Sequence, residues 1–133
     1  MTFYNVSNHP SNKWSKEQRD AALKYADEII DITFPTIDPH ASTDEVYGVA
    51  YRFYGEHFYN KRYEKHTIMI MGEMLFTYAF VHLIYASQLE LSSKNNLTLV
   101  HATTERIAST IIKSDGTTEK QTVFNFVQFR KYY

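Results

Sequence analysis

The chain has 133 residues, of which 44% are hydrophobic and 22% charged, values typical of a folded domain rather than a disordered segment. A formal net charge of −1 argues against a strongly basic surface for long nucleic acids, and the lack of cysteine excludes disulfides and thiolate metal sites. No apolar run approaches the roughly 18 residues of a membrane span. The opening residues lack a signal-peptide pattern, so we expect a cytoplasmic protein without membrane association.

The first half of the chain alternates between strand and helix patterns. Ser15 with Gln18, and Ser42 with Glu45, have the spacing of a capping box, which marks the start of a helix. Short β-branched runs precede and separate these helices. The elements expected here are a strand over residues 2–7, a helix from Ser15 to about Ala26, a strand over 28–35 and a helix from Asp44 to about Asn60.

The second half begins in the same way and ends differently. "HTIMIMG" has the continuous apolar character of a strand buried on both faces. Asp115-Gly116, between two β-prone runs, indicates a hairpin turn. The elements expected here are a strand over 66–72, a helix from Glu73 to Gln88, a loop over 92–96, a fourth strand over 97–104, and a hairpin with arms over 108–113 and 121–129.

The order of these elements predicts the fold class. Strands that alternate with helices imply right-handed crossovers and a mainly parallel sheet. We therefore expect a single α/β domain over residues 1–133, Rossmann-like, with three layers, a mainly parallel sheet and a C-terminal β-hairpin. Ligands of such sheets bind beyond the carboxyl ends of the strands, which here read "SNHP", "FPTIDPH", "GEM" and "TTER".

The first of these ends contains Ser7, Asn8 and His9. The serine and asparagine side chains can donate hydrogen bonds to phosphate or a base, and His9 can exchange a proton near neutral pH. The alternative is a loop in which Ser and Asn satisfy nearby backbone groups and Pro10 fixes the turn.

The third end contains Gly72 and Glu73. Glycine allows close backbone approach, and the N–H groups of a helix start favour an anion. Glu73 fits the first turn of a helix, where an acid complements the helix dipole, and it could instead accept a ribose hydroxyl. The chain has neither G-x-G-x-x-G nor a Walker phosphate loop, which argues against an ordinary NAD enzyme or NTPase.

The fourth end supplies Thr103, Thr104, Glu105 and Arg106 as candidate ligand-binding residues. Arg106 suits a bidentate phosphate contact, or alternatively it pairs with Glu105 or another acid at the surface. The alternative for the two threonines is that they serve only as β-prone residues. Trp14, the single tryptophan, could stack on a base or pack as a hydrophobic anchor.

The six histidines give no metal-binding pattern. His57 and His82 lie on expected helical faces and His101 within a strand, where structural roles are favoured, whereas His40 and His66 lie near loops. No two histidines have H-x-x-x-H or H-E-x-x-H spacing, so we expect neither a metal site nor a cofactor.

With these elements and clusters in place, the chain resembles the CRISPR-associated Rossmann fold (CARF) superfamily, most closely its small standalone members of type III CRISPR systems. The element order, the first strand ending in Ser7-Asn8-His9, and "TTER" after the fourth strand carry this resemblance. The chain departs from larger relatives in having no appended effector domain and in ending with a hairpin.

The resemblance implies a homodimer that binds cyclic oligoadenylate, a small cyclic RNA used as a second messenger in antiviral defence. A ring nuclease would use a ribose 2′-hydroxyl to attack the adjacent phosphorus, without metal. His9 is then the candidate general acid or base, Arg106 stabilises charge, and Ser7 with Asn8 orients the phosphate. The alternatives are a protein that sequesters the messenger without turnover, or a structural or regulatory protein with no nucleotide ligand.

Overall fold

The computed structural model describes residues 1–90 and 96–133 and has an α/β architecture built on one five-stranded mixed sheet. Three helices and two short 3₁₀ turns connect the strands. The elements are, in chain order, β1 (Thr2–Ser7), α1 (Lys16–Leu23), β2 (Glu28–Thr33), α2 (Thr43–His57), β3 (His66–Ile70), α3 (Met74–Glu90), β4 (Leu97–Ile112) and β5 (Thr118–Lys131), with the 3₁₀ turns at Ser11–Lys13 and Tyr59–Lys61.

The strands lie in the order β2-β1-β3-β4-β5. β1 pairs in parallel with both β2 and β3, and β3 pairs in parallel with the first residues of β4, Leu97 to Val100. Only the β4–β5 pair is antiparallel. The expected mainly parallel sheet that ends in a hairpin is therefore confirmed.

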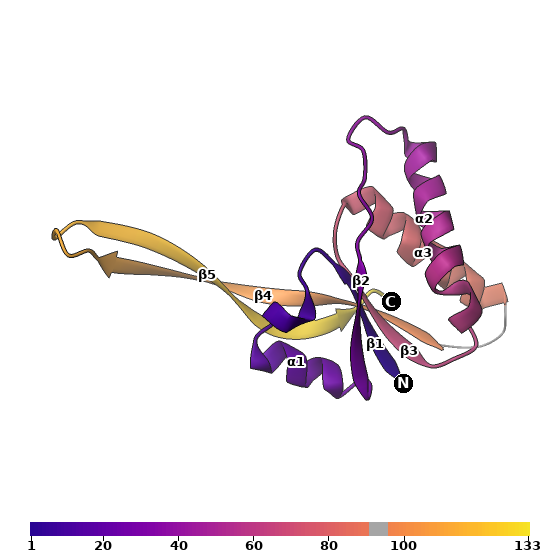
Figure 1. Ribbon diagram of the computed structural model, residues 1–133, viewed down its shortest axis with the longest axis horizontal. Helices are drawn as coiled ribbons and strands as arrows, with labels where there is room; N and C mark the ends of the chain where they lie inside the picture. Colours follow the sequence, from indigo (N-terminus) through magenta and orange to yellow (C-terminus); the bar gives the residue numbers. More distant parts are fainter. Residues whose placement is uncertain (91–95) are drawn as a thin grey trace.

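Helices cover both faces of this sheet (Figure 1). α2 and α3 pack on one face over an aromatic-rich core that includes Phe53, Phe76 and Phe80. α1 packs on the other face over a smaller core in which Phe3 contacts the rings of Trp14 and Phe129. The central strands β1 and β3 are buried on both faces because each face has its own helical layer.

Both predicted capping boxes begin helices. The hydroxyl oxygen of Ser15 accepts a hydrogen bond from the backbone N–H of Gln18, and that of Ser42 accepts one from the N–H of Glu45. The helix ends are less well predicted. α1 stops at Leu23, before Ala26, and α2 stops at His57, where a 3₁₀ turn replaces the last expected residues.

The fourth strand differs most from expectation. A strand ending at Thr104 and a separate hairpin arm beginning at Ala108 were expected, but β4 runs without a break from Leu97 to Ile112. The four residues "TTER" therefore lie inside a strand and not beyond its end. The physical reason is that no glycine, proline or other turn residue interrupts β4, while β5 supplies an antiparallel partner along nearly its whole length.

β4 and β5 continue together well beyond the sheet as a twisted two-stranded extension, which Figure 1 shows projecting from the body. Thr103 and Thr104 pair with Gln128 and Phe126, so Val127 is the additional residue of a bulge where the extension leaves the sheet. At the tip the predicted turn is confirmed, because Gly116 has a φ of +84°, which suits glycine. Of the expected loop over 92–96, residues 92–95 lie outside the described part of the chain.

Candidate functional site

The strand order creates a crevice between β1 and β3. After β1 the chain adds β2 on one side of β1, and it then adds β3 on the opposite side. The direction of the strand order therefore reverses between β1 and β3, and their carboxyl ends form a topological switch point. Ligands of open α/β sheets bind at such points. A cleft of about 960 Å³ lies there, on the α1 side of the sheet, between the 3₁₀ turn with the start of α1 and the base of the β4–β5 extension.

Half of the predicted site residues line this cleft. They are Ser7, His9, Trp14, Thr104 and Glu105. β4 does not end at Thr104 as expected. Thr104 and Glu105 nevertheless line the cleft, because β4 passes beside it. The other five predicted residues are not among its lining residues; they are Asn8, Gly72, Glu73, Thr103 and Arg106.

The loop after β1 is held by a cluster of polar groups around the buried side chain of Asn5. Asn5, which is only 1% exposed, donates through Nδ2 to the carbonyl of His9 and to Oδ1 of Asp31, each at 2.8 Å. Asp31 also accepts from the backbone N–H and the hydroxyl of Ser11, at 3.1 Å through Oδ2. The position of His9 thus depends on residues of β1, β2 and the loop itself.

Ser7 takes part in the same cluster. Its hydroxyl donates to Oδ1 of Asn5 at 2.7 Å and accepts the backbone N–H of His9 at 3.2 Å. This is the local role that the loop interpretation assigned to serine. The side chain of His9 differs, because the residue is exposed, lines the cleft, and its imidazole has no hydrogen bond with any described residue. A ligand in this cleft can therefore contact the imidazole of His9 directly.

Trp14 lies mainly in the core. It is 9% exposed, contacts the Phe3 and Phe129 rings with centroid separations of 6.1 and 6.3 Å, and donates from Nε1 to the carbonyl of His9 at 3.2 Å. The hydrophobic-anchor interpretation therefore describes most of this side chain. Phe124, which is 64% exposed and lines the cleft, offers a larger free aromatic surface for a base.

Arg106 is exposed on β4 and pairs with Phe124 across the extension. Paired residues of antiparallel strands share a side, so the arginine lies on the same side as the cleft but further along the strand. Among the described residues it forms no salt bridge, including with the neighbouring Glu105. Thr103 points to the other side, and its hydroxyl donates to the carbonyl of Gln128 at 3.0 Å.

Gly72 and Glu73 serve the junction between β3 and α3. The carboxylate of Glu73 accepts the backbone N–H of Phe76 at 2.7 Å and so caps the helix, which agrees with the structural alternative. A Cβ atom on Gly72 would lie 2.2 Å from the ring of Phe34, so the absence of a side chain is required by packing. Gly72 borders a second, apolar cavity of about 470 Å³ beside α3.

Of the two C-terminal tyrosines, Tyr132 borders that second cavity and Tyr133 contacts the ring of Tyr85. The hydroxyl of Tyr132 donates to the carbonyl of Ile70 at 2.6 Å, and burial raises its pKa above the ordinary value for tyrosine. Burial, together with the neighbouring Tyr85, raises the pKa of Tyr133 to about 12. Tyr132 lines the second cavity and not the main cleft.

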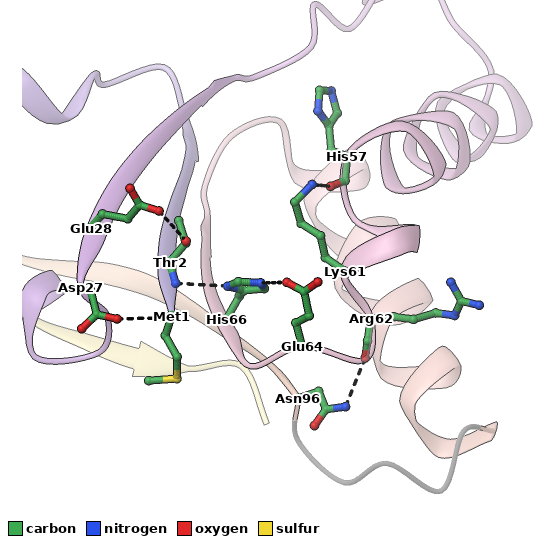
Figure 2. A network of polar contacts seen from close by, with 10 residues as sticks. All are labelled: Met1, Thr2, Asp27, Glu28, His57, Lys61, Arg62, Glu64, His66 and Asn96. Carbon is green, nitrogen blue, oxygen red and sulfur yellow. Dashed lines mark hydrogen bonds and ion pairs between the residues drawn. The ribbon is translucent and has the colours of Figure 1, made fainter.

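His66 lies at the opposite end of the sheet from the cleft, in the polar network that Figure 2 shows. Its Nδ1 accepts the backbone N–H of Thr2 at 3.1 Å, so the ring proton belongs on Nε2, which donates to Glu64 at 2.8 Å. The ring of His57 packs on Phe53, with 4.5 Å between the centroids. These two histidines have structural roles.

Several lining residues were missed at the level of sequence. The aromatic pair Phe124 and Phe126 comes from β5, and Lys13 comes from the 3₁₀ turn. Alternation in "VFNF" places both phenylalanines on one side of a strand, but only the return of β5 along β4 brings that side to the cleft. Lys13 with Glu17 and Glu105 makes the charged lining of the cleft mixed in sign.

Within residues 1–90 and 96–133, no group of three His, Asp or Glu side chains is placed to hold a metal ion. In the same part of the chain, no helix has both the length and the hydropathy needed to cross a membrane.

The sequence profile of the family described as "Uncharacterized protein MJ1673 family" matches residues 1–130. Because this match covers nearly the whole chain, the protein belongs to that family. Comparison with curated proteins and with solved structures gives no match.

Proposed function

We propose that this member of the MJ1673 family has a Rossmann-like fold of the CARF type and acts in type III CRISPR signalling. It binds cyclic oligoadenylate and cleaves it as a metal-independent ring nuclease. One observation carries the proposal: a cleft of about 960 Å³ lies at the switch point between β1 and β3, and the imidazole of His9 is exposed in its wall.

The size and lining of the cleft support a nucleotide ligand larger than one base. Its volume is near the top of the range of about 300–1,000 Å³ for ligand pockets. Phe124 and Phe126 provide ring surface on which a base can stack, and Lys13 with the nearby Arg106 provides positive charge for phosphate. A ring ligand with two-fold symmetry suits a C2 homodimer in which each protomer supplies one such set.

The proposed reaction uses only groups of the chain and of the ring. His9 accepts the proton of a ribose 2′-hydroxyl while that oxygen attacks the adjacent phosphorus in line. The bond between phosphorus and the 5′-oxygen breaks, leaving a 2′,3′-cyclic phosphate, and the departing 5′-oxygen takes a proton from water. Arg106 stabilises the charge on the phosphoryl oxygens, and positioning of the attacking oxygen supplies a large share of the rate.

Two observations favour the non-catalytic alternative, in which the protein sequesters the messenger. The hydroxyl of Ser7 is engaged within the loop cluster, and Arg106 is not among the lining residues of the cleft. The assigned catalytic groups would then reduce to His9, which can bind a phosphate without transferring a proton.

The test is incubation of the pure protein with cyclic tri-, tetra- and hexa-adenylate in chelator, followed by chromatography of the products. We expect one ring to become linear fragments. The His9→Ala variant should lose cleavage by about 10²–10⁴-fold, the usual contribution of a general acid or base, and retain binding. His40→Ala, which changes an exposed histidine in another loop, is the matched control and should cleave like the wild type.

The outcomes separate the candidates. A ring that binds and remains intact with the wild type would support sequestration. Activity that survives His9→Ala would overturn the assignment of the base. Rings that neither bind nor break, with no thermal stabilisation of the protein, would overturn both functions.

A further inference from the structure

The second cavity lies where the chain passes from β3 into α3, on the face of the sheet opposite to the main cleft. Met71 and Gly72, which follow β3, and His101 of β4 form one part of its lining. The other lining residues come from α3 and from the C-terminal segment after β5. Its volume of about 470 Å³ lies within the range of about 300–1,000 Å³ for pockets that hold small molecules.

The walls of the second cavity suit a flat aromatic ring. The centroids of the Tyr132 ring and the His101 imidazole are 5.1 Å apart, and the hydrogen bond to the carbonyl of Ile70 fixes the Tyr132 hydroxyl. On the α3 side, Tyr78 and Met74 are 60% and 85% exposed. Aromatic rings attract one another in offset or edge-to-face contacts, and methionine sulfur makes favourable contacts with ring edges. A planar ligand would therefore cover apolar surface that the free chain exposes.

One buried polar atom in the wall has no partner. Thr77 on α3 lines the cavity, and its hydroxyl oxygen is buried without a hydrogen bond to any described residue. Such groups are uncommon in native proteins, because an unpaired buried hydroxyl costs free energy. Threonine in a helix has two common χ1 rotamers, so rotation about χ1 can bring this hydroxyl to a ligand. Valine has nearly the same shape, so packing alone does not require a threonine at this position.

The imidazole of His101 supplies a second polar edge. The residue is half-buried, and its ring contacts Tyr132 but has no hydrogen bond with any described residue. A neutral imidazole offers one donor and one acceptor. The lining residues of this cavity include no Lys, Arg, Asp or Glu, in contrast to those of the main cleft. A charged ligand would lose water here without gaining a counter-charge, so the lining favours an uncharged molecule.

We propose that the second cavity binds a small, uncharged heteroaromatic molecule. The ring of the ligand packs against Tyr132 and Met74, and its polar edge forms hydrogen bonds with His101 and Thr77. Because these two polar groups would stay unpaired beside a hydrocarbon, they select a ring that carries hydrogen-bonding atoms. The site lies across the sheet from the main cleft, so it does not depend on the nucleotide proposal.

The test is an NMR titration of isotope-labelled protein with three bicyclic probes at mildly alkaline pH. Benzimidazole is uncharged and carries one ring donor and one ring acceptor, indene has a similar shape without polar atoms, and naphthoate is an anion. We expect benzimidazole to bind most tightly. It should shift the amide signals of Thr77 and His101 and leave those of Lys13 and Phe124 in the main cleft in place. Met71 borders both cavities, so its signal does not assign the site.

Two variants remove the polar groups and keep the apolar walls. His101→Phe and Thr77→Val should each weaken benzimidazole binding roughly 2- to 10-fold, the loss expected for one hydrogen bond, and leave indene binding unchanged. Thr77→Val should also raise the melting temperature of the free protein, because it removes the unpaired hydroxyl. The matched control is His82→Phe, at an exposed position of α3 outside the lining residues, which should bind benzimidazole like the wild type.

Circular dichroism establishes that each variant is folded, and if His101→Phe does not fold, Thr77→Val alone decides. The proposal would be overturned if benzimidazole does not bind, or if it shifts only signals of the main cleft. Equal affinities for benzimidazole and indene would overturn the selection for a polar edge, and tighter binding of naphthoate would overturn the selection for an uncharged ligand. Folded variants that keep the affinity of the wild type would overturn the roles of His101 and Thr77.

Discussion

The amide nitrogen of Asn5 lies 2.8 Å from Oδ1 of Asp31, across the parallel pair of β1 and β2. The two residues are register partners, and Asn5 also holds the carbonyl of His9. The loop that presents the His9 imidazole to the cleft is thus fixed by a buried amide within the sheet. In the polar cluster after β1, Asn5 and Asp31 hold the loop in place, and the imidazole of His9 remains exposed for chemistry.

Replacement of Asn5 with Ala should destabilise the fold by about 1–3 kcal/mol, because the carbonyl of His9 and the hydroxyl of Ser7 lose their buried partner. Urea unfolding measures this change in the free energy of unfolding. Asn8→Ala is the matched control at an exposed position and should stay within about 0.5 kcal/mol of the wild type. Equal effects of the two substitutions would contradict the role assigned to Asn5.

Substitution of Gly72 tests whether packing requires a glycine at the β3–α3 junction. Gly72→Ala should destabilise by about 1–3 kcal/mol, because its Cβ would overlap the ring of Phe34. Gly55→Ala on α2 is the control, since a Cβ there has no atom within 4 Å, and it should stabilise by about 0.5–1 kcal/mol.

Combining Gly72→Ala with Phe34→Leu should recover part of the loss, measured by thermal unfolding, because the smaller side chain vacates the overlapping space. Additive losses in the double variant would show that the ring of Phe34 is not the cause.

Phe124 should contribute to the affinity of the protein for cyclic oligoadenylate. Its exposed phenyl lines the cleft, and loss of one base stacked on an aromatic ring costs about 1–3 kcal/mol, so Phe124→Ala should weaken cyclic oligoadenylate binding by roughly 5- to 150-fold. Isothermal titration measures the affinity. Ile112→Ala, at the far end of the β4–β5 extension, removes a similar exposed apolar side chain and should not change the affinity. An unchanged affinity for Phe124→Ala would place the bases elsewhere.

The raised pKa of Tyr133 gives a prediction for alkaline pH. Its pKa rises from 10.0 to about 12 in the folded chain, through burial first and Tyr85 second. The native state therefore holds the phenol proton more tightly than the unfolded state. This contribution to stability is complete below pH 10 and is lost as the pH rises through about 12.

Tyr133→Phe should accordingly move the alkaline unfolding transition to higher pH and remove the tyrosine that ionises last in an absorbance titration. Tyr51→Phe, a change at an exposed position on α2, should leave the transition in place. If both variants unfold at the pH of the wild type, Tyr133 does not contribute to the alkaline transition.

The extent to which the site was predictable differs from residue to residue. His9 and Ser7 were predicted from a polar cluster at the end of a strand, and they do line the cleft. Arg106 was predicted from an expected strand end that is in fact continuous strand, so it lies beyond the cleft. The role of Asn5 was not predictable from the sequence. The hydrogen-bond partners of an asparagine inside a strand can be identified only when the neighbouring strand is known.

The sequence by itself determined the local features of this protein: the helix starts at Ser15 and Ser42, the turn at Gly116, and the alternation of strands and helices. These depend on hydrogen bonds and backbone angles within a few residues of each other. Tertiary structure alone decided the strand order, the continuity of β4 beside β5 and the steric need for Gly72. Those features depend on which distant segments bury one another, and the same local pattern is compatible with many such pairings.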